Sequence, residues 1–243
     1  MSVHLSGDDD VVVVTLDRPH RRNAVDLATL RALRQAQREA SLRRVRVMIL
    51  TGTPPAFCAG ADLNGVENDV FAGALSEVLT GFAALDAVTI AAVEGAALGA
   101  GTQLAVACDL RVATPTSVFG IPAAKLGLAV DSWTVQRLGH EFGWSTARAM
   151  LLSATTRTAD HLHDLGGVHR LGDLDSALAW ARDIAALAPL TIRAHKLALE
   201  HALHTVQPDD VSEHARHAAW ASADAEEGRQ AFLDKRPPRF TGQ

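Results

Sequence analysis

Two segments of small residues could direct backbone NH groups at one point. They are Phe57-Cys58-Ala59-Gly60-Ala61-Asp62 and Ala97-Leu98-Gly99-Ala100-Gly101, and each follows an apolar run typical of a strand. Two NH groups that face one point form an oxyanion hole, which stabilises the enolate of a thioester, and removing one donor typically costs roughly 3 to 4 kcal/mol. The alternative is that both segments are tight turns between a strand and a helix, where small residues serve packing alone.

Few side chains near these segments could transfer a proton. Gln103 lies where a helix begins after the second segment, and its neutral amide cannot accept a proton at neutral pH. Asp131 precedes another expected helix, so its carboxylate could either move a proton or cap that helix. The chain has no tyrosine, and neither Cys58 nor Cys108 stands in a Cys-His arrangement that would activate a thiol.

The sequence lacks the common cofactor and metal motifs. Gly99 and Gly101 could begin a G-x-G-x-x-G dinucleotide motif, but its third glycine position holds Leu104. No G-x-S-x-G, G-x-x-x-x-G-K-[ST] or H-E-x-x-H pattern occurs. His161 and His163 form an H-x-H pair in what we expect to be a polar loop without cysteine, so no metal site is predicted.

Composition limits the class of protein further. The chain has 243 residues, of which 48% are apolar and 21% charged, with a formal net charge of -5. This charge argues against a general affinity for nucleic acid. The N-terminus lacks a signal-peptide pattern, and no apolar run reaches the roughly 18 residues of a membrane helix. We therefore expect a cytoplasmic protein in a reducing compartment, whose two cysteines are small buried residues.

Apolar runs and helical patterns alternate through about residue 170. Strands are expected at 3–5, 11–16, 45–50, 88–93, 110–113 and 117–119, and helices after Asp26, at 71–85 and at 101–107. Ser-Gly-Asp-Asp-Asp between the first two strands predicts a hairpin. Alternation of this kind predicts an α/β fold with a parallel or mixed sheet covered on both faces.

The last third of the chain is predicted to be helical. Helical patterns start at Asp175 and continue over 192–203 and 211–232, with Pro189 and Pro208 between them. A basic tail, KRPPRFTGQ, ends the chain.

Five sequence pieces, in this order, resemble the crotonase superfamily of enoyl-CoA hydratases and isomerases. They are RPHRRNAVD at 18–26, AFCAGADL at 56–63, AAVEGAALGAGTQLAVACDLRVAT at 91–114, GLAVDSWTVQRLG at 127–139 and AFLDKR at 231–236. The resemblance implies a spiral of β-β-α units over residues 1–188 and a helical region over 189–243 that makes the contacts of a homotrimer or hexamer. It implies no metal and no cofactor beyond a coenzyme A thioester as ligand.

The resemblance also assigns binding residues. It implies that the backbone NH groups of Ala59 and Ala100 form the oxyanion hole. Coenzyme A would be held by the segment Arg21, Arg22, Asn23 and Ala24, by the backbone of Ala61, Asp62 and Leu63, and by Phe232 and Lys235.

The acid-base pair of the family's hydratases is replaced in this chain. Two glutamates that activate water in those enzymes correspond here to Gln103 and Ala123. Each acid-base group is typically worth about 10²- to 10⁴-fold in rate, so hydration should be negligible. Asp131 matches an aspartate of the family's dienoyl-CoA isomerases, and Trp133 could form the floor of an acyl pocket or pack in the core.

Three functional hypotheses follow from the resemblance. The first is a fatty acyl-CoA-binding protein without hydratase activity, similar to actinobacterial homologues with the same glutamine and alanine, which are associated with fatty-acid and mycolic-acid metabolism. In it, Gln103, Ala123 and Trp133 would line the substrate site. The second is an enoyl-CoA isomerase that uses Asp131. The third is a scaffold for fatty-acid synthesis enzymes, with weak or absent acyl-CoA binding.

Overall fold

A β-hairpin opens the fold, as the sequence predicts. The computed structural model describes residues 2–62, 69–126, 128–202, 214, 218, 222–234 and 236–243. Strands β1 (Val3–Gly7) and β2 (Val11–Leu16) pair antiparallel, with Val3 opposite Leu16. The carboxylate of Asp8 accepts the NH groups of Asp10 and Val11 in the connection. Polar residues with short side chains favour turns of this kind.

The hairpin forms one edge of a six-stranded sheet. The strand order is β1-β2-β3-β4-β6-β9, where the four later strands are β3 (Val47–Gly52), β4 (Val88–Val93), β6 (Leu110–Ala113) and β9 (Arg170–Leu171). From β2 onward all neighbours are parallel. Their carboxyl ends therefore meet at one edge, from which the two segments of small residues leave.

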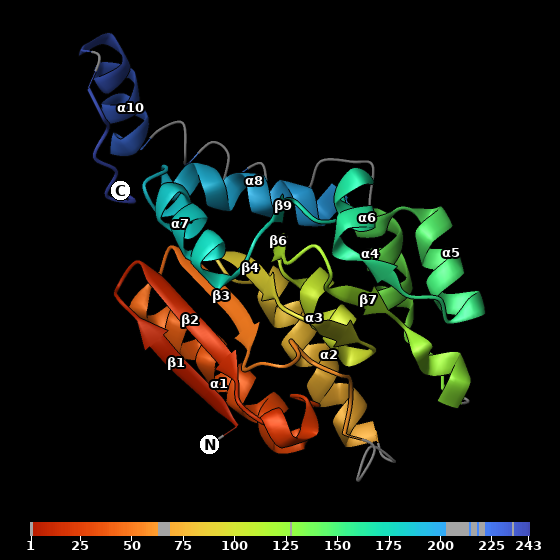
Figure 1. Cartoon of the computed structure of the whole chain (residues 1–243). Coiled ribbons are helices and arrows are strands. Elements are labelled where there is room, and N and C mark those ends of the chain that lie inside the picture. Colours follow the sequence, from red (N-terminus) through yellow and green to blue (C-terminus); the bar gives the residue numbers. More distant parts are fainter. Residues whose placement is uncertain are drawn as a thin grey trace.

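Successive side chains of β2, β3 and β4 alternate between two apolar clusters. Val12, Met48 and Ala91 face a cluster shared with α1 (Leu27–Arg43), α2 (Asp69–Ala83) and α3 (Ala100–Ala107). Val13 and Ile49 face a second cluster, shared with α7 (Leu174–Ala185). Helices thus cover both faces of the sheet (Figure 1).

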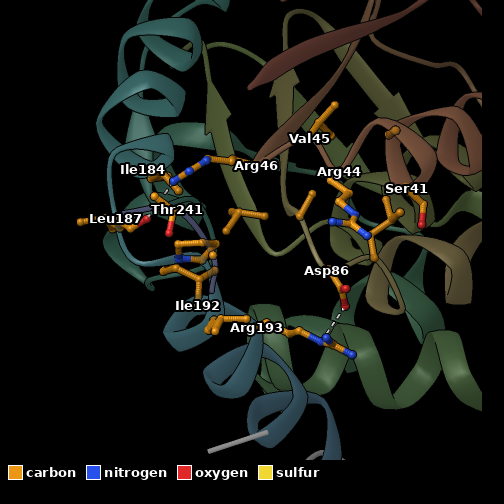
Figure 2. Close-up of a pocket in the computed structure, with 17 residues that line it drawn as sticks. Ser41, Arg44, Val45, Arg46, Asp86, Ile184, Leu187, Ile192, Arg193 and Thr241 are labelled. Atoms are coloured by element: carbon orange, nitrogen blue, oxygen red, sulfur yellow. Dashed lines mark hydrogen bonds and ion pairs between the residues drawn. The ribbon is translucent and has the colours of Figure 1, made fainter. Parts of the chain in front are cut away.

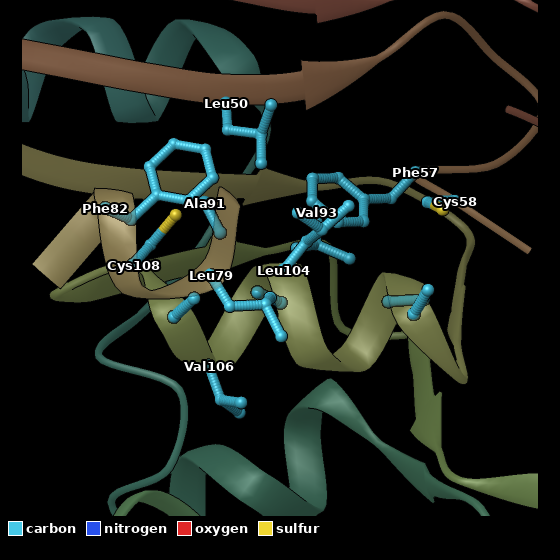
Figure 3. Packing of buried hydrophobic residues seen from close by; sticks show 14 of the residues in the cluster. Leu50, Phe57, Cys58, Leu79, Phe82, Ala91, Val93, Leu104, Val106 and Cys108 are labelled. Atoms are coloured by element: carbon cyan, nitrogen blue, oxygen red, sulfur yellow. The ribbon is translucent and has the colours of Figure 1, made fainter. Parts of the chain in front are cut away.

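Helix α3 is buried along its whole length. Each residue from 100 to 107 is buried, and Figure 3 shows Leu104 and Val106 of this helix in the same cluster as Val93 of β4 and Leu79 of α2. A helix with mostly apolar residues around its whole circumference is expected only in a core, and the two polar side chains of α3, Thr102 and Gln103, are hydrogen-bonded. The start of α3 is consequently a rigid platform at the sheet edge.

A smaller sheet supports the second segment of small residues. Its order is β5-β7-β8, with β5 at Ala96–Leu98, β7 at Val118–Gly120 and β8 at Arg157–Thr158. Beyond it lie η2 (Pro122–Leu126), α4 (Ser132–Phe142), α5 (Trp144–Ser153) and α6 (Ala159–Asp164). The short 3₁₀ turn η1 (Pro19–Arg21) follows β2.

The C-terminal helices α8 (Pro189–Ala202) and α10 (Ala223–Asp234) follow α7. In Figure 1, α10 projects from the rest of the molecule, while the tail after it returns to the body. There the Phe240 carbonyl accepts a hydrogen bond of 2.9 Å from Arg46. Among the residues that the structure describes, no helix is long and apolar enough to cross a membrane.

Most predicted elements are confirmed, with two corrections. The expected strands 88–93 and 110–113 have the observed bounds of β4 and β6. Within the described residues, the expected helix 211–232 is helical at 214, at 218 and over 223–232, but it is not continuous, because Ser222 is a bend and α10 starts at Ala223. His161 and His163 lie on α6 rather than in a loop, since Thr158 accepts the His161 NH and caps a helix there.

Candidate functional site

The segment 57–62 lies between two other stretches of backbone. On one side, Cys58 pairs with the strand β5: its NH donates to the Ala96 carbonyl at 3.0 Å and its carbonyl accepts the Leu98 NH at 2.9 Å. On the other side, Gly60 and Asp62 bond to Val25. The segment is thus an extra strand-like bridge that fixes its peptide groups on both sides.

The expected role of Ala59 is wrong in this structure. Its backbone NH donates to the carbonyl of Arg22 at 2.9 Å, so it is already paired and turned towards residues 22–25. Residue spacing alone could not predict this, because the pairing depends on a contact between two segments 37 positions apart.

The NH of Ala61 is the donor that the geometry favours instead. The Gly60 carbonyl accepts the Val25 NH at 2.9 Å, and the carbonyl and NH of one trans peptide point in opposite directions. The Ala61 NH therefore points away from Val25. No described residue accepts a hydrogen bond from it.

The second predicted donor, Ala100, stands at the start of α3. Gly99 is the N-cap residue with φ 53°, and the first NH groups of a helix have no partner within the helix. The two donors are close in space, because a Cβ placed on Gly99 would lie 3.7 Å from the Cα of Gly60. A Cβ on Gly101 would lie 2.1 Å from the Cys58 carbonyl oxygen, so this close approach requires glycine.

Gln103 joins α3 to α4. Its side chain is buried and donates from Nε2 to Oγ1 of Thr134 at 2.7 Å. The NH of Thr134 in turn donates to Oδ1 of Asp131 at 2.9 Å. Asp131 is exposed and is the N-cap of α4, so the expectation that it caps this helix is confirmed. Thr134 is not among the predicted site residues, although it stands at the third helical position after a capping aspartate.

The other predicted lining residues lie around α3. Ala61, Ala123 on η2 and Trp133 on α4 are partly buried and pack against the apolar cluster that contains Ala100. Leu63 and Lys235 lie outside the described residues, as does the side chain of Phe232.

Residues 18–26 form a turn with two kinds of side chain. Arg21 and Arg22 are exposed, whereas Asn23 is buried and bonds only inward. Its Nδ2 donates to the carbonyls of Thr53 and Ala56, each at 2.7 Å. Asn23 therefore fixes the turn to the loop after β3, while the exposed Arg21 and Arg22 can face an anionic ligand from solution.

The surroundings of the two buried thiols and of the pair His161 and His163 indicate structural roles. Burial raises the pKa of both Cys58 and Cys108 to about 12, so neither thiol is a nucleophile at neutral pH. Nδ1 of His163 lies 2.8 Å from the Val168 carbonyl oxygen. Within the described part of the chain, no group of three or more His, Cys, Asp or Glu is placed to hold a metal ion.

A cavity of 440 Å³ lies at the opposite end of the sheet (Figure 2). It opens between the starts of β3 and β4, the helices α7 and α8, and Thr241 of the tail. Of its arginines, Arg193 is paired with Asp86 at 3.0 Å, and Arg46 bonds Asp10 and three backbone carbonyls. The cavity contains none of the predicted site residues, and we assign it no role.

The model of the enoyl-CoA hydratase/isomerase family matches residues 6–243. The chain belongs to that family. The predicted crotonase-type fold is confirmed by solved structures of family members. An enoyl-CoA hydratase from Mycobacterium tuberculosis H37Rv is 33% identical, with a TM-score of 0.88 and coverage of 100% of this chain and 99% of that one. A family protein from Hyphomonas neptunium is 29% identical, with a TM-score of 0.92 and coverage of 100% and 98%.

Curated relatives of the family extend the same comparison. The "probable enoyl-CoA hydratase echA6" of Mycobacterium tuberculosis is 42% identical over 243 residues, which are 96% of each chain. The "probable enoyl-CoA hydratase echA8" of the same organism is 33% identical, over 96% of this chain and 95% of that protein.

Proposed function

We propose that this protein binds fatty acyl-CoA thioesters through main-chain NH groups and does not catalyse hydration. The observation that supports this proposal is the residue at position 103. It holds a buried carboxamide that donates to Thr134, at the position where the family's hydratases place a water-activating glutamate. Several relatives are named hydratases, but a name does not supply a carboxylate at this site.

The thioester carbonyl would bind at the sheet edge between the NH groups of Ala61 and Ala100. Both are fixed by backbone pairing or by the buried helix α3, so they are preorganised for an oxygen that carries negative charge. Ala123, on η2, offers a methyl group where the second carboxylate would stand. The site can therefore hold and polarise a thioester, while the groups that would activate water are absent from positions 103 and 123.

Binding and hydration can be tested together. Calorimetric titration with a long saturated acyl-CoA should give micromolar affinity, and an absorbance assay should find no addition of water to an enoyl-CoA of similar length. Hydration at ordinary enzyme rates would refute the proposal. Absence of acyl-CoA binding would favour the scaffold for fatty-acid synthesis enzymes instead.

A proline at position 100 would remove one of the two proposed NH donors. Ala100 is the first residue of α3, where proline is tolerated because that NH makes no helical bond. Ala100→Pro should weaken acyl-CoA binding by about fivefold, since one hydrogen bond contributes roughly 1 kcal/mol. Binding of coenzyme A without an acyl group should not change. Ala100→Gly, which retains the NH, is the matched control.

Isomerisation is a second candidate, which the exposed carboxylate of Asp131 favours. Asp131 stands at the end of the hydrogen-bonded series that starts at Gln103. If Asp131 moves a proton between two carbons of an enoyl thioester, Asp131→Asn should abolish turnover and leave acyl-CoA affinity nearly unchanged. If Asp131 only caps α4, the amide oxygen of asparagine can accept the same Thr134 NH, so the substitution should leave stability nearly unchanged, and the parent should show no turnover.

Three further expectations stay predictions. They are a homotrimer or hexamer built through residues 189–243, a place in fatty-acid or mycolic-acid metabolism, and a cytoplasmic location.

A further inference from the structure

The side chain of Arg18 connects the turn at 18–26 to the segment that carries Ala61. One terminal nitrogen, Nη1, donates to the carbonyl of Ala24. The other, Nη2, lies 3.0 Å from Oδ2 of Asp62 and 3.1 Å from Oδ2 of Asp26. The side chains of Arg18 and Asp62 are only 16% and 11% exposed, so solvent screens this pair less than a surface pair.

We propose that Arg18 is a positioning residue that fixes the direction of the Ala61 NH. The inference depends on the proposed thioester site, in which this NH is a donor. Arg18 itself touches no ligand in this proposal. It acts through Asp62, the residue that follows Ala61 in the chain.

Asp62 is anchored to the turn by both its backbone and its side chain. Its NH donates to the Val25 carbonyl at 2.8 Å, and its carboxylate pairs with Arg18. Together with the bond from the Val25 NH to the Gly60 carbonyl, these contacts hold the peptide groups on both sides of Ala61. The orientation of the Ala61 NH is therefore set by its two neighbours in the chain.

The charge arrangement makes the arginine necessary for this orientation. Asp26 and Asp62 both form ion pairs with the same nitrogen of Arg18, so without the guanidinium two partly buried carboxylates would face each other. Like charges repel, and the less constrained segment should move. Partial burial alone would raise the pKa of Asp26, but hydrogen bonds from Thr29 and the charge of Arg18 lower it, so this carboxylate stays ionised at neutral pH.

Lysine cannot replace the arginine here. A guanidinium donates in two fixed directions, which here serve the Ala24 carbonyl and the two carboxylates, whereas an ammonium is a point charge on a flexible stem. Arg18→Lys therefore retains the charge and removes the geometry. Asp62→Asn is the complementary change, because it retains the shape and removes the charge.

The test uses the coenzyme A thioester of 4-dimethylaminocinnamic acid, whose absorption band moves to longer wavelength when its carbonyl is polarised. The full-length protein is titrated to saturation, and the wavelength of the bound probe is compared with that in water. The variants are Arg18→Lys, Asp62→Asn and their combination. Arg43→Lys is the matched control, since Arg43 pairs with Asp9 and Glu39 far from the site in sequence, at the end of α1.

We expect the parent and Arg43→Lys to give the same shift to longer wavelength. Arg18→Lys and Asp62→Asn should each lose at least half of the shift at saturation, and the double variant should lose no more than the worse single one. A full shift in both single variants, with only a lower melting temperature, would refute the inference and leave the thioester site intact. No shift in the parent would refute the thioester site itself. Because the readout concerns bound probe only, a weaker fold or affinity does not imitate the expected result.

Discussion

At the scale of single residues, the hydrogen bond from Gln103 to Thr134 explains why a neutral amide is tolerated in the core. Both side chains are buried, and the bond measures 2.7 Å. Thr134→Val removes the acceptor and leaves the amide unpaired, so it should lower the free energy of unfolding by about 1 to 3 kcal/mol. Urea denaturation measures the change. Thr134→Ser retains the hydroxyl and should cost clearly less; equal losses would show that the methyl packing dominates.

The protonation of His169 should make the stability of the fold depend on pH. Desolvation of the ring and the charge of Arg111 lower the pKa of His169 from 6.5 to about 4. Its Nδ1 accepts the backbone NH of Arg111 at 3.1 Å, which only an unprotonated Nδ1 can do. Because the pKa is lower in the folded state, the unfolded chain binds the proton more readily. The stabilisation that the neutral ring of His169 provides is therefore complete above pH 6.5 and is lost as the pH falls towards 4.

Denaturation series at several pH values test the role of His169. His169→Asn removes the titrating ring and should flatten the dependence of unfolding free energy on pH between 6.5 and 4. His20→Asn, on the exposed turn η1, is the control and should leave the slope unchanged. An unchanged slope in His169→Asn would assign the acid sensitivity to other groups.

At the scale of elements, α8 is fastened to the core by charge. Three charged residues on one face of the helix form ion pairs. Arg193 pairs with Asp86, Lys196 pairs with Asp109, and Glu200 pairs with Arg137. The central residue, Lys196, is 7% exposed. Its ammonium donates to Asp109 at 2.8 Å and to the carbonyls of Phe82 and Ala87 at 2.9 Å each.

Substitutions of Lys196 and Arg193 on this face should differ strongly in how much they lower the free energy of unfolding. Lys196→Met leaves Asp109 without its buried partner and should cost about 3 to 5 kcal/mol of unfolding free energy. Arg193→Met removes a pair whose side chains are 49% and 68% exposed, and should cost less than about 1 kcal/mol. Urea denaturation compares the two. Similar costs would mean that α8 is held by packing rather than by Lys196.

Local sequence patterns predicted the helices and strands well, but they could not predict contacts between segments that are distant in the chain. The apolar run of β2 and the aspartates before α1 and α4 are signals that span only a few residues, and the structure has the hairpin and both N-caps. The donor at 61 rather than 59 depends on pairing with Val25, and Lys196 looks like a surface residue until Asp109 is placed beside it. Arg18 belongs to the piece RPHRRNAVD, yet its pairing with Asp62 spans 44 positions.

At the scale of the whole molecule, the net charge of -5 must be reconciled with an anionic ligand. The exposed Arg21 and Arg22 supply a local positive region beside the proposed thioester site. Arg21→Ala/Arg22→Ala should weaken acyl-CoA binding several-fold at low salt and reduce its dependence on ionic strength, because fewer charge contacts are screened. Arg31→Ala/Arg38→Ala, on the exposed face of α1, is the control. Equal salt dependence in the two double variants would contradict this placement of the phosphates.

The two proposed donors, Ala61 and Ala100, belong to the main chain, and this has a consequence for how such a protein can evolve. Nearly every amino acid carries the same NH, so point mutations in the gene rarely remove a donor. A glutamate that activates water, by contrast, disappears with a single codon change. In a duplicated gene of this family, turnover can therefore decay quickly while recognition of the thioester persists. Selection can then act on recognition alone, and a former enzyme can become a carrier or a sensor without rebuilding its site.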